Sequence, residues 1–190
     1  VHPRGRWAWF NATLHRRWPQ GYAGFMHSRP SVTGTIELDL PEFEHPPEDP
    51  MPLLISWVNA AEKLGVIEPY NVAIATTDDA GDVTNRFVLA KTFDLDGMTF
   101  ATNTSSAKGK QMSAHPRASV VLYWRETRQQ LRLTGAVELL TPAESDDIWV
   151  DRSVQSQAAA TASVQSESLP NDAEYRSEAA RLAKPNLPLP

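Results

Sequence analysis

Residues 85–110, NRFVLAKTFDLDGMTFATNTSSAKGK, decide the fold of this chain. Their pattern predicts two strands joined by a tight Asp-Leu-Asp-Gly turn, then a loop that opens a helix. Arg86 and Lys91 bracket the apolar run Phe87–Ala90, and Lys108 stands where the helix begins. Cationic side chains beside the free N–H groups of a helix start suit a dianionic phosphate. The stretch predicts a phosphate seat; solvated charges at strand ends are the alternative.

The length, composition and net charge of the chain exclude several classes of protein. The chain has 190 residues, 41% of them hydrophobic and 22% charged, which is typical of one soluble globular domain. No apolar run reaches the length of a membrane span, and the net charge of −5 argues against a nucleic-acid partner. There is no cysteine, hence no thiolate ligand or nucleophile. We expect a cytoplasmic protein without a membrane partner or a metal site.

Residues 1–48 read as an extended or disordered lead-in to a domain over 49–190. Residues 1–25 carry four arginines, three tryptophans and no acidic residue. This segment is either a basic aromatic arm or, as we favour, an upstream extension with translation starting at Met26. Residues 26–48 are rich in Pro, Glu and Ser and favour an extended conformation.

The remaining pattern is a meander of strands with helices around it. Asp49-Pro50 predicts the start of a helix that ends at Gly65. Five strands are predicted at 71–77, 83–91, 98–102, 118–124 and 129–139, and further helices at 108–115, from Thr141 and at 171–183. Residues 152–168 read as a linker or as a functional loop over a site. The pattern indicates a mainly β or α+β domain, an antiparallel barrel with surrounding helices.

From about Asp49 to Leu169 the chain resembles the pyridoxamine 5′-phosphate oxidase family. The resemblance rests on motifs in the same order: Asp49-Pro50, the strand Arg86–Lys91, Thr102-Asn103 with Ser106 and Lys108, His115-Pro116-Arg117, Tyr123-Trp124, Gln129-Gln130 with Gly135, and Gln165-Ser166. It implies an FMN-binding split β-barrel that works as a homodimer. The family continues past Pro190 with further strands, so the domain is expected to be C-terminally incomplete, to fold less stably and to bind FMN more weakly.

One branch of the family is more similar, the FMN-dependent oxidases of phenazine biosynthesis. The similarity lies in Tyr123-Trp124-Arg125-Glu126-Thr127 followed by Gln129-Gln130. The vitamin B6 enzymes usually have an arginine at Ala107 and a phosphate-binding tyrosine at Ile148. The resemblance implies an oxidase that takes a hydride from a reduced nitrogen heterocycle to FMN and then to O₂. A pyridoxamine or pyridoxine 5′-phosphate oxidase and a non-catalytic flavin-binding paralogue are the alternatives.

The resemblance also implies roles for individual residues. Arg86 and Lys108 bind the FMN phosphate, and Lys91 lies near the flavin or the substrate. The other expected cofactor contacts are Phe87, Val88, Leu89, Ala101, Thr102, Gln130, Gln165 and Ser166, some of them across the dimer interface. Arg152 and Ser156 occupy substrate-side positions. No catalytic base is expected, because the flavin carries the redox chemistry.

Overall fold

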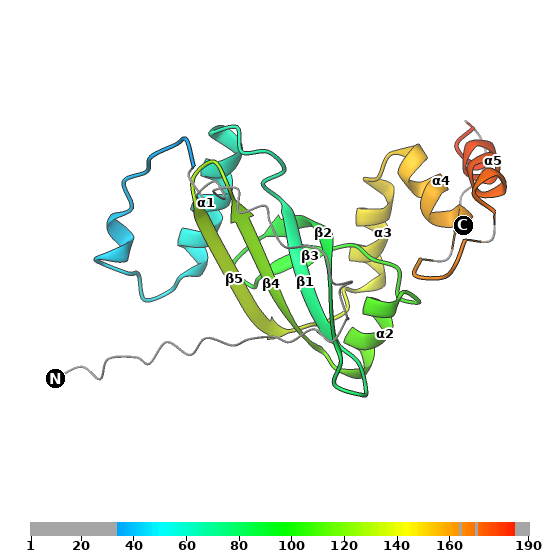
Figure 1. Ribbon diagram of the computed structural model, residues 1–190, viewed down its shortest axis with the longest axis horizontal. Coiled ribbons are helices and arrows are strands. Elements are labelled where there is room, and N and C mark those ends of the chain that lie inside the picture. The colour runs from blue at the N-terminus through cyan, green and yellow to red at the C-terminus, as the bar shows by residue number, and fades with distance from the viewer. Residues whose placement is uncertain (1–33, 164, 170, 185–190) are drawn as a thin grey trace, which may run out of the picture. The chain divides into compact units, whose positions relative to one another are not determined.

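The structure, a computed structural model, describes residues 34–163, 165–169 and 171–184, which form a curled antiparallel sheet with helices around it (Figure 1). The sheet has five strands in the order β3-β2-β1-β4-β5. Their bounds are β1 Asn71–Thr77, β2 Val83–Phe93, β3 Met98–Phe100, β4 Arg117–Trp124 and β5 Gln129–Ala136. All five predicted strands are confirmed. β2 is longer than predicted, whereas β3 and β5 end earlier.

Five α-helices and a short 3₁₀ helix accompany the sheet in the described residues. They are η1 Pro41–Phe43, α1 Met51–Lys63, α2 Ala107–Ala114, α3 Pro142–Val150, α4 Val154–Ala162 and α5 Asp172–Leu182. α1 packs on β2, α2 packs on β1, and α4 packs on α5. None of the described helices has the length and hydrophobicity needed to cross a membrane.

The structure differs from the predicted elements at the start of α1 and within residues 152–168. α1 begins at Met51 with Pro50 as its N-cap, although the Asp49 carboxylate still accepts a hydrogen bond from the Met51 N–H at 2.9 Å. Residues 152–168 are not all loop, because α4 forms within them. Ser153 caps that helix and Ala158 in it is fully buried. The helix was not predicted because its residues are mostly small and have no helical period of apolar side chains.

Part of the predicted lead-in contacts the domain. The Ile36 N–H donates to the carbonyl oxygen of Glu126 at 3.0 Å, and the Trp57 indole donates to the Glu42 carboxylate at 2.5 Å. Gly34 lies so close to the Glu126 carbonyl oxygen that a Cβ would stand 2.3 Å from it. The expectations for residues 1–25 lie outside the described part of the chain.

The core occupies one face of the sheet, under α1. Strand pairing sets Val72 opposite Val88 and Ile74 opposite Val120, and strand alternation turns these side chains to the same side. They join a buried cluster with Leu54, Val58, Ala61, Leu122 and Trp124. Burying each larger aliphatic side chain stabilises the fold by about 1.5–3 kcal/mol. The Trp124 N–H is satisfied by the Pro69 carbonyl oxygen at 3.0 Å.

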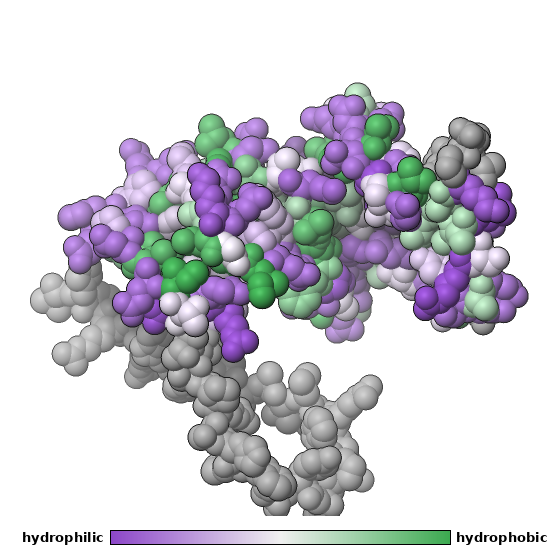
Figure 2. Space-filling model, turned by 90° about the horizontal axis from the view of Figure 1, so that it is seen from above, coloured by the Kyte–Doolittle hydropathy of each residue, from purple (hydrophilic) through white to green (hydrophobic). Residues whose placement is uncertain are grey.

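The opposite face of the sheet, which we call the open face, exposes large apolar groups. Phe87, Leu89 and Tyr123 are 72%, 58% and 46% exposed. The register sets Phe87 on β2 and Val121 on β4 on either side of Ala73 on β1, so the two strands that carry these exposed groups flank the same central strand. Exposed hydrophobic side chains are also visible at the surface in Figure 2, in green. A contiguous apolar area of this kind is typical of an interaction surface.

Candidate functional site

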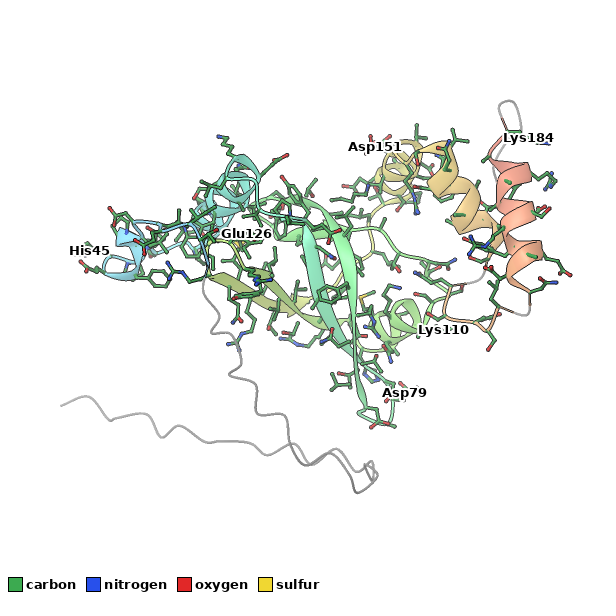
Figure 3. All side chains as sticks on the ribbon, turned by 45° about the horizontal axis from the view of Figure 1, so that its top comes forward. His45, Asp79, Lys110, Glu126, Asp151 and Lys184 are labelled. Carbon is green, nitrogen blue, oxygen red and sulfur yellow. The ribbon has the colours of Figure 1, made fainter. Side chains whose placement is uncertain are left out.

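A cavity of about 650 Å³ lies along β2, between α2 and the α3–α4 junction. Figures 1 and 3 show α2 and α3 beside β2, with Lys110 labelled on α2 and Asp151 at the end of α3. The volume falls within the range of about 300–1,000 Å³ of small-molecule sites. The lining residues are Arg86, Phe87, Val88, Leu89, Lys91, Ala101, Thr102, Ala107, Lys108, Asp151, Arg152, Ser153, Ser156, Gln165 and Ser166.

One wall of the cavity is an unpaired edge of β2. β3 pairs only with the end of β2, from Ala90 to Phe93, so the preceding residues have no strand on that side in the described structure. The Ala90 N–H points the other way, to the Tyr70 carbonyl oxygen. Because backbone groups alternate along a strand, the N–H and C=O groups of Phe87 and Leu89 point away from β1, toward the edge that β3 leaves open. The edge therefore offers free donors and acceptors to a flat polar ligand.

Arg86 lines the cavity, and hydrogen bonds from both terminal nitrogens hold its guanidinium in place. One guanidinium nitrogen donates to the Thr76 hydroxyl at 2.6 Å and to the Ile74 carbonyl oxygen at 3.4 Å. The other donates to the Thr84 hydroxyl at 2.5 Å and to the Gln111 amide oxygen at 3.4 Å. Burial lowers the pKa of Arg86. All four partners are neutral.

Lys108 brings a second cation, and a buried one, to the same place. Its side chain is 6% exposed, and its Nζ donates to the Gln165 amide oxygen at 3.1 Å and to the Ser106 hydroxyl at 3.4 Å. Burial lowers the pKa of Lys108, and the charge of Arg86 lowers it further. Within the described residues neither cation forms an ion pair. Two close cations, one buried and one partly buried, without a carboxylate partner favour an anionic ligand.

The first turn of α2 adds to this anion site. Ser106 is fully buried and caps the helix by accepting from the Gly109 N–H at 3.2 Å. A Cβ on Gly109 would stand 2.4 Å from the Thr104 carbonyl oxygen, so the incoming loop folds directly against the helix. The Ala107 N–H donates to the Ser166 hydroxyl at 3.2 Å. The positive end of the helix dipole thus lies beside Lys108 and Arg86.

The α3–α4 junction supplies a further cationic side chain, in addition to Arg86, Lys91 and Lys108. The Arg152 guanidinium lies over the Trp149 ring, 5.4 Å from its centroid, and donates to the Ser156 carbonyl oxygen at 3.4 Å. The Gln157 amide fixes the same turn by donating to the Trp149 carbonyl oxygen at 2.7 Å. Asp151, the one acidic residue among those lining the cavity, precedes Arg152. This junction faces the cavity from the side opposite the β2 edge.

The structure brings together all but one of the site residues named from the sequence. The exception is Gln130, which lies on β5 opposite Tyr123, exposed and outside the cavity. Sequence reasoning did not name Asp151 and Ser153 in the lining, nor Thr76, Thr84 and Gln111 around Arg86. Spacing could have pointed to Gln111, because it follows Lys108 by three residues and so shares its helical face.

Comparisons with known proteins agree with this geometry. The family described as pyridoxamine 5′-phosphate oxidase matches residues 60–184. A dihydrophenazinedicarboxylate synthase of Pseudomonas chlororaphis is 37% identical over 84% of this chain and 72% of the relative, and one of Burkholderia lata is 36% identical over 84% and 76%. A pyridoxine/pyridoxamine 5′-phosphate oxidase of Caulobacter vibrioides is 41% identical over 65% of this chain and 56% of the relative.

Two solved structures are similar as well. PhzG of Burkholderia lata 383, in complex with tetrahydrophenazine-1-carboxylic acid, has a TM-score of 0.78 at 35% identity and covers 83% of this chain and 78% of its own. A pyridoxamine 5′-phosphate oxidase-related, FMN binding protein of Nostoc punctiforme has a TM-score of 0.56 at 21% identity and covers 67% and 71%. The expected split-barrel fold is confirmed by the first of these. On the family match and these identities, the chain belongs to the pyridoxamine 5′-phosphate oxidase family.

Proposed function

We propose that this protein binds FMN in the cavity beside β2 and is an oxidase of the phenazine-biosynthesis type. In that role it removes a hydride from a reduced nitrogen heterocycle and delivers the electrons to O₂. The observation that carries the proposal is a pair of neighbouring cations, the partly buried Arg86 on β2 and the buried Lys108 in the first turn of α2, which have no acidic partner in the described structure.

The residues present fit FMN at both of its ends. The phosphate would lie against Arg86, Lys108 and the first turn of α2, where two positive charges match a dianion. The ring would lie along the β2 edge, where the backbone of Phe87 and Leu89 offers donors and acceptors to its polar rim. When bound, the flavin supplies the hydride-accepting group and passes electrons to O₂. The protein's part is to orient the ring and to exclude water from it.

The substrate side of the cavity favours an acid group other than a phosphate. Arg152 and Lys91 are the cations there, and Ser156 adds a hydroxyl that can donate. A carboxylate needs one or two such donors, whereas a dianionic phosphate needs more charge to replace its hydration. Ile148 on α3 adds no polar atom and does not line the cavity. A carboxylated heterocycle suits this set of donors.

The second candidate function is a pyridoxine/pyridoxamine 5′-phosphate oxidase. It is favoured by the 41% identity to such an enzyme over 124 residues. It is opposed by Ile148 and Ala107, which provide neither a hydroxyl nor a charge for a substrate phosphate. The two functions differ in the substrate that reduces the bound flavin, so one experiment separates them.

We also propose that two copies pair through the open face. Phe87, Leu89 and Tyr123 are too exposed there for a face that stays in water. Gln130 lies opposite Tyr123 across the β4–β5 ladder, so it shares the open face and would lie in the interface between the two copies. Sedimentation of the wild type and of Tyr123→Arg tests this: the wild type should be a dimer and the variant a monomer.

The function is tested by titrating the purified protein with FMN and then adding substrates without oxygen. Tetrahydrophenazine-1-carboxylic acid should bleach the visible absorbance of the bound flavin, and admitting O₂ should restore it. Bleaching by pyridoxamine 5′-phosphate instead would establish the second candidate. Stoichiometric flavin binding without bleaching by either compound would indicate a non-catalytic flavin-binding protein and refute the oxidase proposal.

A further inference from the structure

Arg86 is held by a symmetrical pair of hydrogen-bond relays. The hydroxyl of Thr76 accepts from one guanidinium nitrogen at 2.6 Å, and the hydroxyl of Thr84 accepts from the other at 2.5 Å. Each hydroxyl then donates to the same atom, the Gln111 amide oxygen, at 2.6 Å from Thr76 and 3.1 Å from Thr84. Only the amide oxygen can accept these bonds, so the contacts also fix the orientation of the Gln111 amide.

The relays come from three elements that only the folded chain brings together. Thr76 is on β1, Thr84 and Arg86 are on β2, and Gln111 is on α2. The register sets Thr76 opposite Thr84 and Ile74 opposite Arg86, so all of these side chains leave the sheet on the side that α2 covers. Thr76 is 2% exposed, which shields this end of the guanidinium from water.

The chemistry of the acceptors is unusual for a partly buried arginine. Such a group is ordinarily paired with a carboxylate, which would stabilise it but would also cancel its charge. Here hydroxyl, carbonyl and amide oxygens, which are all neutral, accept from its two terminal nitrogens and leave its positive charge uncancelled beside the cavity. A carboxylate at position 111 would lie 3.4 Å from the guanidinium, the distance of the present amide oxygen. It would compete with any anion for Arg86.

Gln111 itself is not among the residues lining the cavity, whereas Arg86 and Lys108 are. It therefore acts on a ligand through Arg86. We propose that Gln111 is the positioning residue of the phosphate seat: as the common acceptor of both relays, it fixes the Arg86 guanidinium in place at the seat and keeps the seat dicationic. This inference rests on the proposed binding of FMN.

The test compares two ligands that differ only in the phosphate, FMN and riboflavin, in fluorescence titrations of the full chain. Gln111→Glu keeps the shape of the side chain and adds a carboxylate. We expect it to weaken FMN binding by about tenfold or more and to change riboflavin binding less than about twofold. Gln111→Met, which has no acceptor and no charge, should weaken FMN binding less than Gln111→Glu does, and again spare riboflavin. Ser113→Asp, exposed on the same helix, adds one charge away from the relays and should leave both affinities unchanged.

Two results would overturn the inference. One is FMN affinity in both Gln111 variants equal to that of the wild type. The other is an equal loss of FMN and riboflavin, which would make Gln111 a purely structural residue. A wild type that binds FMN no better than riboflavin would instead refute the phosphate seat itself, and the inference with it. If Gln111→Glu does not fold, as judged by circular dichroism, Gln111→Met decides alone.

Discussion

Replacing Lys108 by methionine should separate ligand binding from fold stability. The substitution keeps the length of the side chain and removes its charge. Lys108 is 6% exposed and has no acidic partner in the described structure, so a bound phosphate is its natural counterion. Two charges about 4 Å apart interact by about 4 kcal/mol at an effective dielectric constant of about 20, and truncating one partner of a buried charge pair costs about 2–5 kcal/mol. We expect Lys108→Met to weaken FMN binding by about 3 kcal/mol, or roughly 150-fold.

In Lys108→Met, the free energy of unfolding of the ligand-free protein should increase or stay the same. Burial and the neighbouring Arg86 lower the pKa of Lys108, which means that the charged form is disfavoured at this position. Methionine removes that cost and loses the hydrogen bond to Gln165, worth about 1 kcal/mol. Titration with FMN and thermal unfolding without ligand measure the two effects, with the exposed Lys110→Met as control. Unchanged FMN affinity, or a fall in stability as large as the fall in binding, would contradict the reasoning.

Three further predictions concern the effect of pH, the close packing of Gly109 in α2 and the contact between Trp149 and Arg152. As pH rises through the lowered pKa of Lys108, the stability of the ligand-free protein should increase, because the unfolded chain binds this proton more tightly than the folded one. FMN affinity should fall over the same pH range, because Lys108 loses its charge. Lys108→Met should show neither change. Gly109→Ala should lower the free energy of unfolding by about 1–3 kcal/mol, since its Cβ would meet the Thr104 carbonyl oxygen, whereas Gly135→Ala, with nothing within 4 Å, should unfold like the wild type. Trp149→Ala should raise KM several-fold without changing kcat, because the Arg152 stacking is worth about 0.5–2 kcal/mol, and Trp149→Phe should recover most of it.

The sequence was most informative where structure is local. Strand alternation, turn residues and the start of α3 at Thr141 depend on neighbours in the chain, and the pattern predicted all of them. Thr141 and Glu144 form a capping box at that helix start. Arg86 and Lys108 were named for the same reason, since each marks the end of a local pattern; both line the cavity, and their contact with FMN stays a prediction. α4 was missed because its helix is stabilised by a cap and by small buried residues rather than by an apolar stripe.

Contacts that depend on strand register and on how helices pack on the sheet could not be predicted from the sequence. The relays from Arg86 to Gln111 exist because β1 pairs with β2 in one register and α2 lies across both strands. Neither condition follows from residue spacing alone. The position of Gln130, outside the cavity on the open face, depends in the same way on how β5 joins the sheet. Such long-range pairings are set by the whole core.

Burial decides how much the alanine at position 107 weakens the phosphate seat. The vitamin B6 enzymes resembled by this chain usually have an arginine there, so its absence removes one charge. Ala107, however, is exposed at the start of α2, whereas Lys108 is buried. An exposed charge pair contributes about 0–1 kcal/mol because water and salt screen it, against about 2–5 kcal/mol for a buried one. The backbone N–H of residue 107 remains in place for any side chain and already donates to Ser166. In the proposed seat, most of the attraction for a phosphate would therefore come from Arg86 and Lys108, and the exchange at position 107 would weaken it only slightly.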